Sequence, residues 1–335
     1  MRIVDSHFHW RPRSILEDLC ERTGYPRAER DGNGGYFYVR KPGLITSNSW
    51  AAWYDLDAEL AHMDTLGRGV IDVVNSIGPF SIHYSELPVD EGREAALVYN
   101  EHNAEAQRKH AGRFWGTAAV PLVDTATAID VMDHAILKLG LVGVNVPCSI
   151  GDDPRIDAER LEPFYDRVEE LGVPILLHPT DAMFFENFNE GYGGALHLSL
   201  GRVVEVSVAA ARLIFSGIME RHPKLKVVMS HTGGALPYQA GRLDKNGKQA
   251  KLAEPPSVYL KRMYTDTVSP HSLGMKFAID FFGADHVMYG TDYPCWMPAD
   301  ALRLLDEIGI PQDDQLKIFS SNARELFNLR VPANV

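Results

Sequence analysis

The sequence has few cysteines and no spacing that would pair them. Only three occur among 335 residues, namely Cys20, Cys148 and Cys295. The number is odd and no CxxC motif is present, which argues against a disulfide framework and against a thiolate zinc site. Unpaired cysteines are typical of a reducing compartment, so we expect a cytoplasmic protein.

The chain also lacks a positive charge excess and long apolar runs. It carries 33 Lys and Arg against 45 Asp and Glu, a formal net charge of −12, whereas nucleic acids and anionic membranes are bound by clustered basic residues. No stretch approaches the about eighteen apolar residues of a membrane span, and the N-terminal MRIVDSHFHW does not resemble a signal peptide. We therefore expect neither a nucleic-acid partner nor a membrane partner.

What the sequence does contain is an alternation of short apolar runs with longer amphipathic segments. The runs are rich in Val, Ile and Leu, as in strands that are buried on both faces, and the segments repeat apolar residues at helical spacing. Eight such strands predict an α/β fold, a (β/α)8 barrel that spans 1–335 as one domain. The expected strands are 2–7, 70–77, 114–120, 142–146, 174–178, 226–231, 263–268 and 287–292. The expected helices are 55–66, 91–109, 124–139, 157–171, 200–221 and 272–282, with a last helix, 313–329, across the barrel exterior.

One connection is far longer than the loops that usually join a strand to its helix. Residues 11–54 separate the first strand from the first helix, and their segment GGYFYVRKPGLITSNSW is typical of two short strands around a Lys-Pro-Gly turn. Long loops after barrel strands lie over the active site. We therefore interpret 11–54 as a lid inserted into the barrel.

Histidines and one aspartate stand at the ends of predicted strands. His7 and His9 end the first strand two residues apart, so their side chains share one face. The fifth, sixth and eighth strands end at His178, His231 and Asp292. A parallel barrel gathers all these ends at one mouth. Imidazole and carboxylate groups suit Zn²⁺, and also Fe²⁺ or Mn²⁺, so we predict a divalent metal ion at this mouth.

Four motifs occur in an order that is similar to a known superfamily. VDSHFH, LLHP, MSHTGGALPYQAGR and YGTDYP resemble the amidohydrolase superfamily, and within it the branch typified by aminocarboxymuconate semialdehyde decarboxylase. The resemblance extends over nearly the whole chain and implies a distorted (β/α)8 barrel. It also implies the ligands of the metal, which is usually zinc: His7, His9, His178 and Asp292. The position of His231 acts on the metal-bound water in that family.

The resemblance also implies a reaction. It favours a mononuclear, non-oxidative decarboxylase of an aromatic or muconate-type acid, with metal-bound water and with His231 and Asp292 transferring the proton. One metal is expected because the fourth strand, VGVNV, lacks the lysine or carboxylate that bridges two metals in other members. Three alternatives use the same site: a hydrolase of a carbon–carbon or amide bond, an iron- or manganese-dependent oxygen enzyme, and a non-catalytic subunit assembled with a paralogue.

Three further side chains are candidates for binding a small carboxylate substrate. Arg242 matches a family position that reaches the substrate of the adjacent subunit, which implies a homodimer or higher oligomer. Arg40 in the lid is a second candidate, because a guanidinium grips a carboxylate through two hydrogen bonds. Trp10 directly follows the first histidine pair and is a candidate for stacking on a planar substrate. Asp266, near the end of the seventh strand, either orients a ligand or has a structural role, and the sequence leaves both open.

Overall fold

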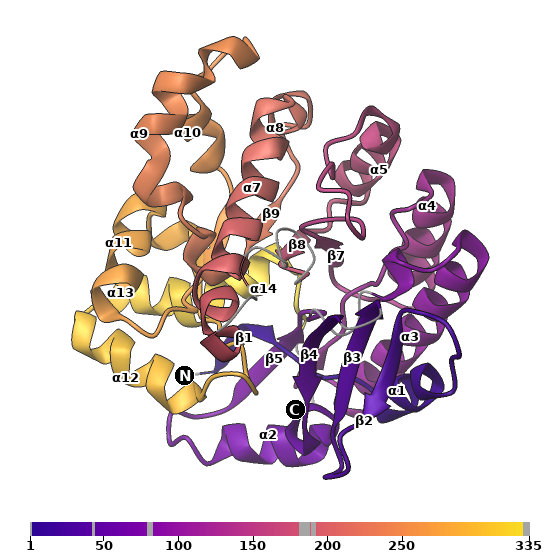
Figure 1. Cartoon of the computed structure of the whole chain (residues 1–335). Coiled ribbons are helices and arrows are strands. Elements are labelled where there is room, and N and C mark those ends of the chain that lie inside the picture. The colour runs from indigo at the N-terminus through magenta and orange to yellow at the C-terminus, as the bar shows by residue number, and fades with distance from the viewer. Residues whose placement is uncertain (1, 42–43, 79–82, 181–187, 189–191, 331–335) are drawn as a thin grey trace.

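The computed structural model describes residues 2–41, 44–78, 83–180, 188 and 192–330. Two parallel sheets lie at its centre (Figure 1). The first has the order β1 (Ile3–Phe8), β5 (Ile71–Asn75) and β6 (Phe114–Trp115). The second has the order β11 (Val287–Met288), β10 (Tyr264–Asp266), β9 (Val227–Met229), β8 (Ile175–His178) and β7 (Val144–Pro147). Each of the eight predicted strands is present, although several are shorter than expected.

Backbone contacts join the edges of the two sheets on both sides. Ala118, just beyond β6, forms a parallel bridge with Val144, and Phe8 forms one with Tyr293. The amide of His9 also donates to the Tyr293 carbonyl at 2.9 Å. The strands thus follow one another in chain order around a ring, which is the predicted distorted (β/α)8 barrel.

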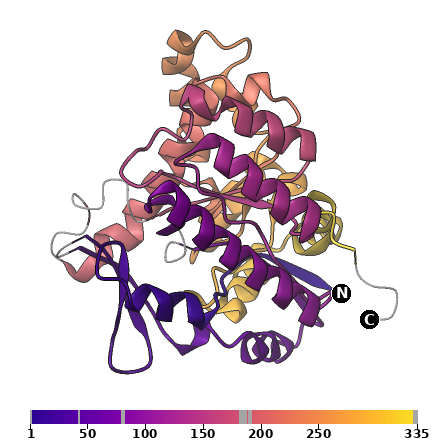
Figure 2. The same cartoon turned by 90° about the vertical axis from the view of Figure 1, so that its right-hand side faces the viewer.

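Helices surround this ring in both views (Figures 1 and 2). The predicted ones are α2 (Leu56–Asp64), α3 (Val89–Lys109), α4 (Thr125–Asp133), α5 (Glu162–Leu171), α7 (Arg202–Phe215), α8 (Ile218–Arg221) and α11 (Ser272–Phe282). Among the described helices, four others were not predicted: α1 (Arg13–Cys20), α9 (Leu236–Asn246), α10 (Pro256–Leu260) and α12 (Pro298–Ile308). Within the described ranges, no helix combines the length and apolar character that a membrane crossing requires. None of the three cysteines forms a disulfide within the described residues.

The C-terminal segment lies elsewhere than predicted. The expected helix divides into α13 (Gln312–Leu316), a π turn and α14 (Asn322–Leu326). Ala323 of α14 belongs to one apolar cluster with Val4 of β1 and Val228 of β9, strands on different sides of the ring. The prediction of exterior packing is therefore wrong. The segment covers the barrel end opposite the histidines, because apolar side chains that point into the barrel there need an apolar cover.

The insertion forms a small layer of its own beside the barrel. It contains α1 and an antiparallel sheet in the order β2 (Arg27–Arg30), β3 (Tyr36–Lys41) and β4 (Leu44–Ser49). The two predicted strands are β3 and β4, whereas β2 and α1 were missed. Figure 2 shows this sheet at one side of the helices that cover the barrel. Its apolar side chains pack in one cluster with residues of α1 and α3.

Candidate metal centre

The three strand-end histidines of the predicted ligand set lie together. The ring centroid of His7 is 5.0 Å from that of His9 and 5.1 Å from that of His178, and the last two are 5.0 Å apart. All three side chains are buried. The barrel therefore brings the ends of β1 and β8 to one point, as the strand pattern predicted.

The Nδ1 atom of each of these imidazoles contacts a protein oxygen. The three contacts are His7 with Asp266 Oδ2 at 2.6 Å, His9 with the Ser76 carbonyl at 2.6 Å and His178 with the Pro179 carbonyl at 2.9 Å. In a neutral imidazole whose Nδ1–H donates there, the lone pair lies on Nε2. The Nε2 atoms of His7 and His178 are buried without a hydrogen-bond partner in the described structure. These are suitable metal-binding atoms.

Asp292 completes the cluster. Its Oδ1 lies 2.8 Å from His9 Nε2 and 3.5 Å from His7 Nε2, and its Oδ2 lies 3.7 Å from His231 Nε2. One candidate ligand atom from each of four residues lies within 4.8 Å of the others: His7, His178, His231 and Asp292. This set differs from the predicted one because it includes His231 in place of His9. The structure thus brings His231 as close to the centre as the predicted ligands.

The electrostatic surroundings favour the forms that bind a cation. Burial lowers the pKa of His178 well below its ordinary value, and burial also lowers that of His9. Burial alone would raise the pKa of Asp292, but contacts with the histidines hold it well below its ordinary value. Burial alone would lower the pKa of His7, but the neighbouring carboxylates of Asp266 and Asp292 have the larger effect and raise this pKa to about 10. Neutral imidazoles and a carboxylate suit a divalent metal, which at His7 would replace a proton.

Asp266 at the end of β10 orients two parts of this site. Besides its contact with His7, its carboxylate accepts hydrogen bonds from the amides of His231 at 3.2 Å and Thr232 at 3.1 Å. Both of these residues have φ of 55°, a left-handed conformation that is uncommon outside glycine. Of the two roles that the sequence left open for Asp266, the structure supports the orientation of a ligand.

We expect Asp266→Asn to weaken metal binding by about 10- to 100-fold, the usual cost of losing an outer partner of a metal ligand. The Oδ2 of Asp266 contacts both His7 and the amide of His231, while its Oδ1 accepts from the amide of Thr232. An amide has only one acceptor oxygen, so it would lose the contacts of one of these two oxygens. Competition with a chelator measures the dissociation constant. Asp285→Asn is the control, because Asp285 is exposed and pairs with Lys317 at 2.9 Å. An unchanged dissociation constant in Asp266→Asn would contradict the assigned role.

Gly290 allows the strands that carry these residues to approach closely. A Cβ atom at this position would lie 2.8 Å from the Cβ of His7 and 2.9 Å from that of Asp266. Gly290→Ala should therefore lower the free energy of unfolding by about 1–3 kcal/mol, as overpacking does. Urea denaturation measures the change. Gly24→Ala is the control because its Cβ would meet nothing within 4 Å, and equal midpoints for both variants would contradict the prediction.

Asp5 is a member of the site that was not predicted. This buried carboxylate accepts hydrogen bonds from the hydroxyl of Thr291 at 2.5 Å, from its amide at 3.1 Å and from the amide of His7 at 3.1 Å. It thereby links the ends of β1 and β11. The sequence did contain a signal for Asp5, because it is an acidic residue inside an otherwise apolar run that is expected to be buried. The carbonyl contacts of the histidines carry no such signal, because every residue has a carbonyl.

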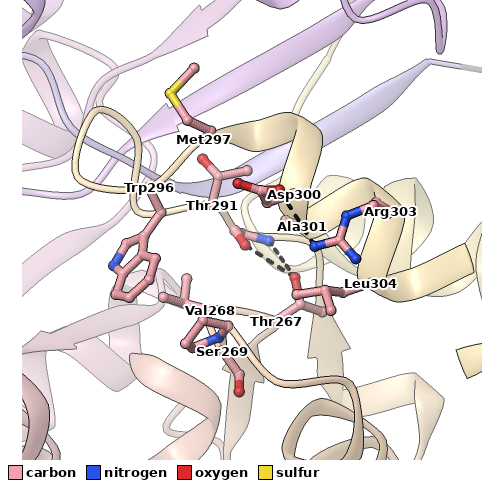
Figure 3. Close-up of a pocket in the computed structure, with 12 residues that line it drawn as sticks. Thr267, Val268, Ser269, Thr291, Trp296, Met297, Asp300, Ala301, Arg303 and Leu304 are labelled. Atoms are coloured by element: carbon pink, nitrogen blue, oxygen red, sulfur yellow. Dashed lines mark hydrogen bonds and ion pairs between the residues drawn. The ribbon is translucent and has the colours of Figure 1, made fainter. Parts of the chain in front are cut away.

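A pocket of about 200 Å³ lies beside the cluster (Figure 3). Its walls are the turn after β10, the end of β11 and the start of α12. Thr267 and Thr291, the sequence neighbours of two site aspartates, line it, but the site histidines do not. Figure 3 shows Asp300 and Arg303 paired in one wall, with Trp296 on the other side. The pocket is therefore adjacent to the metal centre but separate from it.

Arg40 has other partners than the predicted substrate. Its guanidinium is buried and forms ion pairs with Glu86 and, at 3.0 Å, with Asp152. The hydroxyl of Tyr38 donates to the same Glu86 at 3.1 Å. A buried charge requires an opposite charge nearby, and here Arg40 joins β3 of the insertion to the segment after β7. These ion pairs give Arg40 a structural role, and its contact with a substrate stays a prediction.

The other two residues that were predicted to bind substrate, Trp10 and Arg242, lie in different parts of the structure. Trp10 follows the end of β1 and is part-buried. Its ring meets Phe114 edge-on at 5.5 Å, and its indole N–H donates to the Tyr54 carbonyl at 3.1 Å. The ring thus packs against the protein, and the stacking of Trp10 on substrate stays a prediction. Arg242 is exposed on α9.

The fold and this cluster define a class, the barrel enzymes whose metal centre lies at the carboxyl ends of the strands. The model of the Amidohydrolase family matches residues 4–329. The chain therefore belongs to the amidohydrolase family. The prediction of a metal-dependent carboxy-lyase or hydrolase of this superfamily is confirmed.

Relatives of known activity match most of the chain. A 2-amino-3-carboxymuconate-6-semialdehyde decarboxylase of Dictyostelium discoideum is 28% identical over 310 residues, which cover 87% of this chain and 81% of its own. A gamma-resorcylate decarboxylase of a Rhizobium species is 31% identical over 252 residues, with 70% and 76% covered. The crystal structure of a 2,6-dihydroxybenzoate decarboxylase with 2,6-dihydroxybenzoate superposes with a TM-score of 0.80 at 25% identity, with 98% of this chain and 100% of the other covered.

Proposed function

We propose that this chain is a mononuclear, divalent-metal-dependent, non-oxidative decarboxylase of an aromatic or muconate-type carboxylic acid. The observation that carries the proposal is the pair of buried Nε2 atoms of His7 and His178, which lack a hydrogen-bond partner among the described residues. A buried polar atom without a partner is costly, and a cation among these ligands removes that cost. The decarboxylase relatives support the choice of reaction.

The residues that would hold the ion are His7, His9, His178 and Asp292. Zinc is the first choice, with manganese or iron as alternatives. When bound, such an ion supplies a Lewis acid that lowers the pKa of a coordinated water or phenol. Asn145 on β7 supports a single ion, because its amide oxygen accepts from Ile77 at 2.9 Å and its NH₂ donates to Thr117 at 2.6 Å.

His231 and Asp292 are placed to move the proton that the reaction needs. When the carbon–carbon bond breaks and carbon dioxide leaves, the electron pair stays on the substrate carbon, which then takes up a proton. Asp292 Oδ2 faces His231 Nε2 at 3.7 Å, while its Oδ1 faces His7 and His9. We propose that His231 gives this proton to the carbon, where it stays in the new C–H bond, and that His231 then takes a proton from solvent, with Asp292 as its partner. Residues 11–54 would cover the site as a lid within one cytoplasmic, single-domain enzyme.

Product analysis tests the proposed reaction. Protein with a quantified metal content is incubated with a panel of hydroxybenzoates and unsaturated dicarboxylic acids, and carbon dioxide and the organic product are measured. In D₂O the product should carry one deuterium at the carbon that lost the carboxylate. Two organic fragments without carbon dioxide would indicate a hydrolase, and oxygen consumption would indicate oxygen chemistry. No turnover of any acid by metal-loaded protein would favour a non-catalytic subunit.

An exposed apolar patch supports the expected homodimer. Tyr238 on α9 and Leu273 and Phe277 on α11 are 79%, 70% and 45% exposed, and the first and last rings are 6.3 Å apart. Exposed patches of this kind mark protein interfaces. We propose that two copies associate through this patch and that Arg242, on the same helix as Tyr238, reaches the substrate carboxylate in the partner.

Sedimentation measures this association. Tyr238→Asp with Phe277→Asp should yield monomers, whereas the exposed Leu137→Asp after α4 should leave the mass unchanged. A parent protein that is monomeric at assay concentrations would contradict the proposal.

A further inference from the structure

Two buried side chains from the insertion lie directly behind the metal centre. Trp53, at the end of the short turn Ala51–Trp53, stacks on His9 with ring centroids 5.5 Å apart and 20° between the planes. The guanidinium of Arg11 lies over the same indole, 4.0 Å from its centroid. The exposed fractions are 1% for His9, 1% for Trp53 and 2% for Arg11.

The indole is itself held in place. The amide of Arg11 donates to the Trp53 carbonyl at 3.0 Å, and the Trp53 amide donates to the Trp50 carbonyl at 2.9 Å. An arginine guanidinium stays protonated in proteins, so the group over the indole is a cation. A cation over tryptophan is the strongest pairing of this kind, and it is stronger still when desolvated.

The His9 ring has little room to turn. Its Nδ1 contacts the Ser76 carbonyl, and a Cβ atom at Gly78 would lie only 3.2 Å from the same nitrogen. Trp53 covers the ring. A rotation of the ring about its Cβ–Cγ bond would therefore push one edge of the imidazole into the indole.

We infer that Trp53 is a positioning residue for the metal centre, which fixes the orientation of His9 by stacking on it. The inference rests on the proposed function, since it requires that the cluster binds a metal ion. It means that the insertion is part of the metal centre itself. His7 takes its orientation from the carboxylate of Asp266, whereas His9 takes it in part from an aromatic ring contributed by the insertion.

Trp53→Leu tests the inference, because it keeps an apolar side chain but removes the flat ring. The dissociation constant for Co²⁺ and the visible spectrum of the Co²⁺-loaded protein are measured, and the unfolding temperature of the metal-free protein is recorded beside them. We expect binding about 10-fold weaker than in the parent, at the lower end of losses for outer partners of metal ligands, with a changed spectrum. Trp53→Phe should restore most of the affinity.

Trp115→Leu is the matched control, since Trp115 is a part-buried tryptophan that packs at the α14 end of the barrel. It should lower the unfolding temperature without changing the Co²⁺ dissociation constant. A parent that binds no Co²⁺ would overturn the proposed function itself. A parent that binds Co²⁺, together with a Trp53→Leu variant of equal affinity and spectrum, would overturn the role of Trp53 alone. If Trp53→Leu does not fold, Trp53→Met replaces it with the same two outcomes, because methionine adapts to irregular space.

Discussion

His178→Ala and Asp292→Ala are each expected to weaken metal binding by more than about 100-fold, beyond the usual 10- to 100-fold cost of losing an outer partner. His178 presents a buried Nε2 atom that has no partner in the described protein. Asp292 presents both oxygens to histidines, at 2.8 Å from His9 and 3.7 Å from His231. His178→Ala removes a neutral ligand and Asp292→Ala removes a charged one. Water replaces either ligand poorly in a buried site. Decarboxylation should be lost with the metal.

Metal quantification on protein purified without added metal, followed by calorimetric titration, measures this effect. His134→Ala is the matched control, because His134 follows α4 and its side chain is 41% exposed. The control should keep the parent's metal content and affinity. Variants of His178 and Asp292 that still hold one ion per chain with the parent's affinity would refute the proposed centre.

His231→Asn should lower kcat by about 10²- to 10⁴-fold, the usual contribution of a positioned acid or base, while metal affinity stays close to that of the parent. His231 is the least buried histidine of the cluster, with its side chain 11% exposed. Its turn is held through backbone amides that donate to Asp266, so the imidazole is not needed for the turn. Asparagine also tolerates the left-handed conformation at this position.

His231→Asn distinguishes between two roles that the position of His231 allows, metal binding and proton transfer. The ligand atoms of His231 and of three other residues lie within 4.8 Å of one another, so a metal-binding role and a proton-transfer role make different predictions. Steady-state kinetics and the metal dissociation constant are measured on the same samples, with His102→Asn on α3 as a control for the substitution. If metal affinity falls in parallel with kcat, His231 is a ligand and the proposed proton transfer is wrong.

Local sequence patterns were sufficient to predict most strands and helices of the barrel. They were insufficient to predict the helices outside the repeating strand–helix units or the position of the C-terminal segment. Strands such as β8 and helices such as α3 carry continuous apolar runs or long helical periodicity, which tertiary context seldom overrides. The helices that were missed, among them α1 and α12, are 8 and 11 residues long, so each spans only two or three turns. The C-terminal segment was recognised as helical, but its place under the barrel depends on which strands surround it.

In the candidate site, too, local patterns predicted some features and tertiary structure decided others. The sequence alone determined that His7, His9, His178, His231 and Asp292 meet, because a parallel barrel brings every strand end to one mouth whatever the details of packing. Only the tertiary structure decided which side chains contact these residues, namely Asp266 on His7 and Trp53 on His9, and that Arg40 of the insertion pairs with Glu86. Such contacts join elements far apart in the chain, and they depend on rotamers and on the stagger of neighbouring strands. No local pattern encodes either.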